Sequence, residues 1–518
     1  MTNLSRSLVL GCSVLALAAC GPEEIASPGA NGDINIGDIN VGGGTGGTPT
    51  PTPTGVTPAA GCPTIGADEL ANSGTITGPT GEWRVCTLPS VFSEDATLPY
   101  VPGVLYAMNG RVDIGVDDGP TADASDGIEG TTVDLTIEAG AIVYAATGRS
   151  YLVAQRGSTL NIEGEANRPV IFTSEDNVEG LNNNSSSQQW GGIVLLGRAP
   201  VSDCASGTPN PANQVECQQE LEGALNPPSF GGNTPGDSSG SIEYLQIRYS
   251  GFTLAQGSEL QSLTTGGVGS GTTISHVQSY NSSDDGVEIF GGNVNMDHFI
   301  VVGAEDDSFD IDTGAKADIQ FALAVQRAGA GDRALELDSP DGDFTIDAMP
   351  RTHARFSNFT FWAAGGGSQA VAVRGAADLT MVNGVIVKPN GNCVSVNGDE
   401  TAAGRSTADE AGEPSFESVG FQCSSADSGQ VLGYINAGTG NVLDYTNTLT
   451  GNYLNGASET GFTPIFDVTA LSSFFETVNF IGAVPNGADW TQGWTCDSAT
   501  VSFGSGNSCQ SLPVYSQV

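Results

Sequence analysis

The sequence predicts an all-β protein built as a right-handed parallel β-helix, a solenoid with coils of about 22 residues. Gly accounts for 72 of 518 residues and the charged fraction is only 14%, a composition typical of short strands and turns. Short apolar strands recur about every 20 to 25 residues, and no helical segment lies between them to carry a crossover. Strands that close into coils at a regular period without helices indicate a solenoid.

The repeat is clearest where one acidic turn occurs three times. Residues 274–292 align with residues 296–314 at a constant offset of 22, and the next coil aligns at an offset of 26, which implies a small loop insertion. This register makes the following residues equivalent: His276 and His298; Asp285 and Asp307; Glu288, Asp310 and Glu336; Asp312 and Asp338. Because adjacent coils lie about 4.8 Å apart, we expect equivalent side chains to form ladders.

The N-terminus predicts an exported, lipid-anchored protein. Arg6 precedes an apolar run over residues 8–19 that is too short to span a bilayer, so residues 1–19 are predicted to be a signal peptide. The run ends in LAACG at 17–21, which resembles the lipobox of bacterial lipoproteins and implies cleavage before Cys20 and acylation of that cysteine. The alternative is an ordinary secretory signal with a chance cysteine. Gly21 stands where Asp would follow the cysteine of a retained lipoprotein, which implies export to the outer membrane.

The rest of the chain divides by composition. Residues 20–60 are rich in Gly, Pro and Thr and are predicted to be a flexible tether. Residues 61–129 are predicted to form an N-terminal cap with the first strands, and residues 130–392 the parallel β-helix with an inserted loop at 200–240. Residues 393–518 lose the repeat and are predicted to form the last coils and a cap, with 467–483 as a short helix and strand.

Eight cysteines remain after the signal peptide and Cys20. An even number in an exported chain predicts disulfides, although eight cysteines allow 105 connectivities. Sequential pairing is the most economical choice, and it closes loops short enough for each bond to contribute about 3 kcal/mol. The expected pairs are Cys62–Cys86, Cys204–Cys217, Cys393–Cys423 and Cys496–Cys509.

The chain is strongly acidic, with 16 Lys plus Arg against 59 Asp plus Glu and a formal net charge of −43. Such a surface repels nucleic acid and anionic lipid headgroups, so these partners are not expected. The charge serves either solubility or the binding of cations. Stacked carboxylates repel one another, and Ca²⁺, which takes six to eight oxygen ligands, would compensate for the repulsion. The candidate calcium ligands are Asp284, Asp285, Glu288, Asp306, Asp307, Asp310, Glu336 and Asp338.

A solvated acidic rim is the alternative to calcium, with Lys316, Arg327 and Arg333 as the cations nearest in sequence. The equivalent residues His276 and His298 would form a structural pair or, as the less favoured interpretation, bind a metal or act in acid–base chemistry. Trp190, Trp362, Trp490 and Trp494 are expected in the core or cap, with sugar stacking as the alternative. No zinc spacing, catalytic triad or nucleotide motif is recognisable, and no organic cofactor is expected.

Several motifs resemble a family of bacterial exported, pectin-lyase-like β-helix outer-membrane lipoproteins, found in Proteobacteria and Bacteroidota. These motifs are LTIEAGAIV, RGSTLNIEGEANRPVIFTS, WGGIVLLGRAP, GGVGSGTTISHVQSYNSSDDGVEIFGG, DDSFDIDTG and FFETVNFIGAVPNGADWTQGWT, and they cover residues 130–495. The resemblance implies the β-helix fold but carries no established activity.

Related β-helices that resemble pectate lyases and polygalacturonases act on polysaccharides. This likeness makes Asp285, Asp307, Asp310 and Glu336 candidate catalytic carboxylates, because carboxylates one or two coils apart span the separations used by glycosidases. The GHG and RIK motifs of polygalacturonases are missing, as is a basic cluster for an acidic polysaccharide.

Three functions are therefore compatible with the sequence. The first is a non-enzymatic, outer-membrane lipoprotein that binds a glycan or protein with the help of calcium. The second is a polysaccharide hydrolase or lyase, and the third is an accessory protein of an outer-membrane uptake receptor, which depends on location alone.

Overall fold

The computed structural model describes residues 55–515, apart from residues 67, 209–213, 223, 225, 256–257, 340–348, 399–400, 402–408, 410 and 426. Residues 53–518 form one compact unit, and the description below concerns this unit alone. Residues 1–19, Cys20 and most of the predicted tether lie outside the described residues. Among the described residues, no helix is long and apolar enough to cross a membrane.

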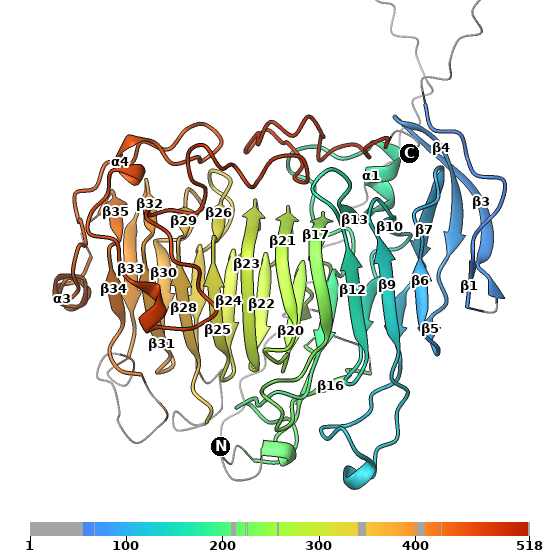
Figure 1. Ribbon diagram of the computed structural model, residues 1–518, viewed down its shortest axis with the longest axis horizontal. Helices are drawn as coiled ribbons and strands as arrows, with labels where there is room; N and C mark the ends of the chain where they lie inside the picture. The colour runs from blue at the N-terminus through green and yellow to red at the C-terminus, as the bar shows by residue number, and fades with distance from the viewer. Residues whose placement is uncertain are drawn as a thin grey trace, which may run out of the picture. The chain divides into compact units, whose positions relative to one another are not determined.

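Parallel strands stack side by side through the unit and form the three faces of a β-helix (Figure 1). We call these faces A, B and C. Each coil passes from a strand on face C to face B, then to face A, and on to the next strand of face C. β22 (Val287–Phe290), β23 (Asn293–Val302) and β24 (Phe309–Asp312) illustrate one such turn of the chain. The predicted all-β class and parallel solenoid are confirmed.

Three long strands, β17 (Gly240–Arg248), β21 (Thr273–Tyr280) and β23, bend at the corner between two faces, so that their first parts lie on face B and their second parts on face A. Face A contains β4 (Gly81–Thr87), β7 (Val104–Met108), β10 (Ile142–Ala145), β13 (Val170–Ser174), these second parts, and then β26 (Leu323–Val325), β29 (Thr360–Trp362), β32 (Val385–Lys388) and β35 (Gly420–Cys423). Face B contains β6 (Ala96–Leu98), β9 (Asp134–Glu138), β12 (Thr159–Glu163), the first parts of β17 (Gly240–Arg248), β21 (Thr273–Tyr280) and β23, and then β25 (Lys316–Gln320), β28 (His353–Ser357), β31 (Asp378–Val382) and β34 (Ser415–Glu417). Face C contains β5 (Val91–Phe92), β8 (Arg111–Ile114), β11 (Tyr151–Ala154), β14 (Ile193–Leu196), β20 (Leu263–Gly266), β22, β24, β27 (Leu335–Leu337), β30 (Gln369–Val373) and β33 (Asn392–Val396).

The strand register agrees with the repeat expected from the sequence. Ile274 pairs with Met296 and Glu288 pairs with Asp310, which is the offset of 22. Asp310 then pairs with Glu336 at the offset of 26. Alternate residues of each strand point inward, and the core they build is made of Val, Ile, Leu and Phe side chains, with Phe309 in contact with Phe299, Phe356 and Phe361.

Non-repeating segments cover the N-terminal coils. β1 (Thr64–Ile65) pairs with β2 (Asp68–Glu69), and β3 (Ala71–Gly78) forms an antiparallel hairpin with β4. The short helix α1 (Glu175–Glu179) follows β13 and contacts β3. The insertion at 200–240, with η2 (Gln214–Glu216), β15 (Gln219–Glu220) and β16 (Ser229–Phe230), packs apolar side chains on the outer side of face C. The pair β18 (Thr253–Ala255) and β19 (Ser258–Glu259) forms a further small hairpin.

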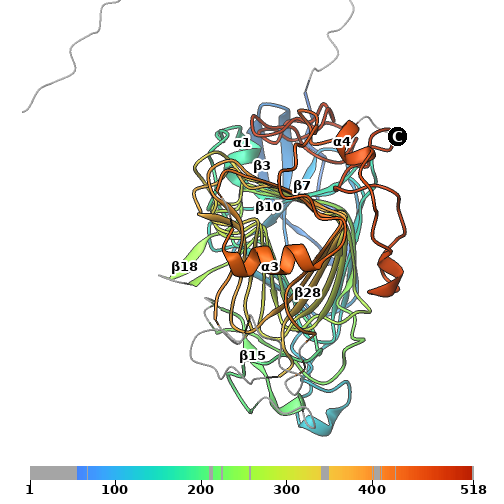
Figure 2. The same cartoon turned by 90° about the vertical axis from the view of Figure 1, so that its left-hand side faces the viewer.

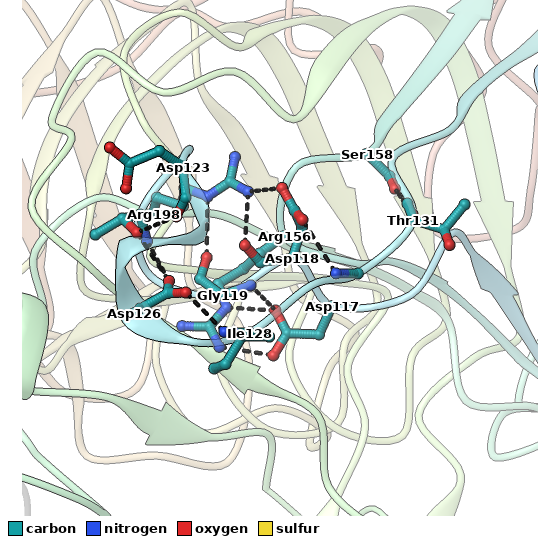
Figure 3. Close-up of polar contacts among 12 residues, drawn as sticks. Asp117, Asp118, Gly119, Asp123, Asp126, Ile128, Thr131, Arg156, Ser158 and Arg198 are labelled. Atoms are coloured by element: carbon teal, nitrogen blue, oxygen red, sulfur yellow. Dashed lines mark hydrogen bonds and ion pairs between the residues drawn. The ribbon is translucent and has the colours of Figure 1, made fainter.

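A salt-bridge network holds the loop 115–131, which contains η1 (Ala124–Asp126), against this insertion (Figure 3). The guanidinium of Arg156 donates to both carboxylate oxygens of Asp117, at 2.7 and 2.6 Å, and also to the carbonyl of Gly231. Arg198 donates to the carboxylate of Asp118 at 2.8 Å and to the carbonyl of Gly119. Both arginines are buried, so their charges are compensated by these partners and the acidic loop has a structural role.

The C-terminal region differs from the sequence-based expectation. The helix α3 (Gly429–Ala437) lies across the last coils, as Figure 2 shows, and so supplies the expected cap with a short helix. Residues 467–483, predicted to be a helix and a strand, contain only the 3₁₀ turn η3 (Val468–Ala470), and that prediction was wrong. The segment has no strand because its backbone pairs with side-chain amides, not with another strand.

We call residues 439–515 the C-terminal strap. It contains α4 (Ala457–Thr460) and runs back beside the coils toward β4 and α1 (Figure 1). Amide side chains from alternate coils bind its backbone through paired hydrogen bonds. Gln278 binds Cys496, Gln320 binds Glu476 and Asn383 binds Phe466, each amide both donating to a carbonyl and accepting from an N–H group.

All four predicted disulfides are confirmed. The bonds Cys62–Cys86, Cys204–Cys217, Cys393–Cys423 and Cys496–Cys509 have Cα–Cα distances between 4.9 and 5.6 Å. They lie in the N-terminal hairpin, the insertion, the last coils and the strap. Each therefore stabilises a segment where the regular coil repeat is interrupted or ends.

Candidate acidic cation site

Three carboxylates occupy the same outward position on face C in three successive coils. Glu288 lies between the core residues Val287 and Ile289 of β22, so strand alternation directs it outward. Asp310 in β24 and Glu336 in β27 have equivalent apolar neighbours, and the register pairs Glu288 with Asp310 and Asp310 with Glu336. The sequence repeat therefore produces the carboxylate ladder that was expected from it.

The turns before these strands add a second pair of carboxylates. Asp285 accepts a hydrogen bond from the backbone N–H of Asp307 at 2.8 Å, and Asp307 in turn accepts one from the N–H of Arg333. Each aspartate thus connects its own coil to the next one. Gly286 follows Asp285, and a Cβ there would lie 2.6 Å from the carbonyl oxygen of Ser308, which explains the glycine of the SDDG turn. Part of the role of these aspartates is structural.

Two arginines neutralise one half of the cluster. Arg333 forms ion pairs with Glu336 at 3.0 Å, with Asp307 at 3.6 Å and with Asp332. Arg374 binds Glu336 and Asp338, both at 2.8 Å. Of the cations expected from the sequence, only Arg333 takes part. Lys316 pairs with Asp409 and Arg327 pairs with Glu305.

The other half of the cluster has no such ion pairs, although the charge of Arg374 partly opposes the rise in the pKa of Asp310. In the described part of the chain, neither arginine forms an ion pair with Asp285, Glu288 or Asp310. One carboxylate oxygen from each of these three residues lies within 4.8 Å of the others. The oxygen atoms Oε2 of Glu288 and Oδ1 of Asp310 are buried and accept no hydrogen bond from any described residue. We call these three residues the carboxylate triad.

Burial and mutual repulsion raise the pKa of each member of the triad well above its usual range. Burial is the largest cause for Asp285, followed by the charges of Asp284 and Asp310. The pKa of Glu288 is raised by burial and then by Asp285, and that of Asp310 by burial and then by Glu336. At the edge of the cluster, burial and the charge of Asp306 raise the pKa of Asp284 to about 7. Near neutral pH the triad therefore requires either protons or a cation.

Ca²⁺ prefers oxygen ligands such as carboxylates, and the triad brings three of them together. A second group, formed by Asp307, Asp310 and Glu336, also brings one oxygen each within 4.8 Å, but Arg333 already occupies part of it. The remaining candidates, Asp284 and Asp306, lie in the more exposed turns and form groups with Asp285 and with Asp332. Asp338 binds Arg374 and the N–H of Ser339, so its environment differs from that of the triad.

The histidines lie elsewhere, at the corner between faces B and A. Tyr244, His276 and His298 occupy equivalent positions with positive φ angles of 53°, 54° and 51°, and their rings stack in succession. The two imidazole planes are nearly parallel, at 9°, with ring centroids 4.3 Å apart. One ion cannot lie in the planes of both rings, so a shared metal site would require rearrangement. Burial, with the charge of His298, lowers the pKa of His276 to about 4, which is consistent with a neutral structural residue.

The tryptophans occupy structural positions. Trp190 packs on Phe172 in the core, and Trp494, which belongs to the strap, is fully buried against the coils. Trp490 stacks on Trp494, and Trp362 contacts Tyr453 of the strap. Trp190 and Trp494 therefore offer no ring surface for sugar stacking, whereas Trp362 and Trp490 are half-buried.

The architecture places this chain in the class of parallel β-helix proteins, and its long faces carry ladders of polar side chains. The family model of the pectate-lyase-like beta helix domain matches residues 127–495, and the chain belongs to that family. No curated protein and no solved structure matches the chain.

Proposed function

We propose that this protein is a non-enzymatic binding protein, anchored in the outer membrane through Cys20, whose carboxylate triad holds Ca²⁺ for the attachment of a glycan or protein partner. One observation carries the calcium proposal. Two buried carboxylate oxygens of the triad, Oε2 of Glu288 and Oδ1 of Asp310, accept no hydrogen bond from any described residue. Buried charged groups without partners are costly, and a divalent cation would compensate both.

The distribution of charge supports a position for the ion within the triad. Arg333 and Arg374 compensate Glu336, whereas Asp285 and Glu288 have no arginine partner in the described part of the chain. A Ca²⁺ ion held by three carboxylates keeps room for further oxygen ligands, since it takes six to eight. A partner would approach this site at its edge, where the more exposed carboxylates of Asp284 and Asp306 lie, because Asp285 and Glu288 are themselves buried.

A stability measurement tests the calcium site. Ions that bind only the folded state raise the free energy of unfolding, by about 2.7 kcal/mol at a hundredfold excess over Kd. We expect a higher Tm in millimolar calcium than in EDTA at matched ionic strength. The double variant Glu288→Gln with Asp310→Asn should lose this increment and should be more stable than the wild type in EDTA, because it relieves charge repulsion.

A matched control is available on face B. Glu163 and Glu243 pair in adjacent coils in the same manner but are exposed to water. The variant Glu163→Gln with Glu243→Gln also removes two negative charges, but away from the triad, and it should keep the full increase in Tm that calcium produces. An equal Tm for the wild type in calcium and in EDTA would refute the calcium site and leave the cluster as a structural acidic rim.

The raised pKa of the triad also supports a second candidate, a polysaccharide hydrolase. A carboxylic acid that stays protonated near neutral pH can serve as a general acid. The burial of the cluster speaks against this function, since Asp285 and Glu288 are only 6% and 7% exposed. A panel of polysaccharides tests both functions at once. Retention without cleavage products favours binding, and new reducing ends or unsaturated products favour catalysis.

A further inference from the structure

A groove on the outer side of face A lies away from the acidic cluster, over the N-terminal coils. It consists of two adjoining hollows of about 540 and 350 Å³, and both are lined by Ala146, Glu175 and Glu179. In the larger hollow the hairpin β3–β4 forms one wall and α1 forms the other, and in the smaller hollow α1 faces residues 145–148 and 188–189. We call it the hairpin groove. Its two hollows could accommodate two consecutive units of a chain-like ligand.

The groove is built by segments that are not part of the coil repeat. The tip of the hairpin touches α1 so closely that a Cβ on Gly78 would lie 1.8 Å from the carbonyl oxygen of Val178. α1 begins at the capping residue Ser174, which accepts a hydrogen bond from the N–H of Asn177. Both walls are therefore held by defined contacts, and the space between them is a feature of the folded chain.

The floor of the groove contains an aromatic residue with a free hydroxyl group. Tyr144 is only 4% exposed, and its ring packs in the apolar cluster with Trp83 and Val85. It nevertheless lines the groove, and its hydroxyl forms no hydrogen bond with any described residue. Its neighbours across the strands are Ala107 and Thr173, which are small. Burial, followed by the charges of Glu175 and Glu179, raises its pKa to about 12, so the group remains a neutral donor.

The chemistry of the walls limits the ligand. Hydroxyl and amide groups line both hollows, among them Ser73, Thr75 and Thr77 of β3, and Asn109 and Gln188. The charged residues lining the groove are Glu175, Asp176 and Glu179, and no lysine or arginine is among the described lining residues. The groove therefore repels anionic chains such as polygalacturonate. Hydroxyl groups of an uncharged ligand can donate to the carboxylates and accept from Tyr144.

We propose that the hairpin groove binds an uncharged oligosaccharide, with Tyr144, Glu175 and Glu179 as its central hydrogen-bonding groups. Two adjoining hollows suit at least two consecutive sugar units. The site is separate from the carboxylate triad, and its binding does not require Ca²⁺.

Calorimetric titration of the purified protein with neutral tetrasaccharides tests the site. The probes are cellotetraose, xylotetraose, mannotetraose and maltotetraose, with tetragalacturonate as the charged control, each measured in EDTA and in calcium. We expect at least one neutral probe to bind equally in both buffers and tetragalacturonate not to bind. Calcium-dependent binding alone would assign recognition to the triad and overturn the groove, whereas the absence of a calcium effect on stability would leave the groove unaffected.

Two variants locate the binding. Tyr144→Phe keeps the packed ring and removes one hydroxyl, and we expect affinity to fall about three- to tenfold. Glu179→Gln should lower it by about tenfold, because its carboxylate accepts stronger, charge-assisted hydrogen bonds. Glu163→Gln, on the exposed surface of face B, is the control and should bind as the wild type does. If no neutral probe binds, or if all variants bind with equal affinity, the proposal is wrong.

Discussion

The protonation of the carboxylate triad should control how stability depends on pH. The pKa values of Asp285, Glu288 and Asp310 are raised in the folded state, so the folded protein binds more protons than the unfolded chain. Their contribution to stability is fully present below the pKa of an unfolded carboxyl group and is lost as the pH rises through the raised values. Calcium favours the ionised form, so its stabilising effect should increase over the same range.

We therefore expect Tm in EDTA to fall as the pH rises above the usual range of a carboxyl pKa, and calcium to restore it more at pH 8.5 than at pH 6.5. Buried histidines act in the opposite direction, but only up to the pKa of an unfolded histidine, about 6.5. The pKa values of His276 and His353 are lowered to about 4 by burial, so both are neutral in the folded and unfolded states at the upper end of the range. The measurement is a thermal melt across pH for the wild type and the Glu288→Gln, Asp310→Asn variant. An identical slope for the two proteins would contradict the assignment.

At the site, the sequence predicted the ladder and one of its cations, Arg333, but not Arg374. Glu288, Asp310 and Glu336 repeat at offsets of 22 and 26, which periodicity detects. Arg374 follows the next strand of face C, where Glu336 pairs with Ala372 at an offset of 36. This offset of 36 is much longer than the offsets of 22 and 26 in the preceding coils, so the repeat could not be recognised there and Arg374 was missed. Tyr144 was missed because the sequence of its strand, IVYA, has the same apolar pattern as the strands of other coils. The groove above it is formed only when the hairpin and α1 pack against that strand.

At the scale of elements, the strap depends on side-chain amides that replace a neighbouring strand. The amide of Gln278 donates to the carbonyl of Cys496 at 3.2 Å and accepts from its N–H at 2.8 Å. Further along, the buried Arg248 donates to the carbonyls of Cys509 and Ser511. Such pairs lack periodicity in the sequence, which explains why the coils could be predicted and the path of residues 467–483 could not.

Gln278→Leu tests this attachment. The substitution preserves the approximate volume and leaves the buried N–H and C=O groups of Cys496 without their partner, at a cost of about 2 kcal/mol. We expect a lower denaturation midpoint and faster hydrogen exchange of the Cys496 amide. Gln430→Leu, on the exposed side of α3, is the control; it removes a hydrogen bond to the hydroxyl of Tyr434 and should not change the exchange of the Cys496 amide. Unchanged exchange at Cys496 in the Gln278 variant would show that the strap is held by other contacts.

At the scale of the whole molecule, the net charge limits how the proposed anchoring could work. A formal charge of −43 makes the protein repel anionic headgroups, so electrostatics does not hold it at a membrane. Attachment would then depend on the acyl chains of Cys20, where each buried methylene contributes about 0.8 kcal/mol and several chains together give stable anchoring. The following Gly and Pro-rich residues would separate the β-helix from the bilayer.

Replacing Cys20 by Ser removes the atom that carries the lipid and leaves the described β-helix unchanged. We expect the variant to incorporate no labelled palmitate and to move from the outer-membrane fraction to the soluble fraction. Its Tm should equal that of the detergent-solubilised wild type, since residue 20 lies outside the compact unit formed by residues 53–518. Cys12→Ser, within the predicted signal peptide, is the matched control and should remain acylated and membrane-bound. Palmitate incorporation in the Cys20→Ser variant would contradict the lipoprotein assignment. A variant without lipid that still sediments with the membrane would instead indicate attachment through a partner.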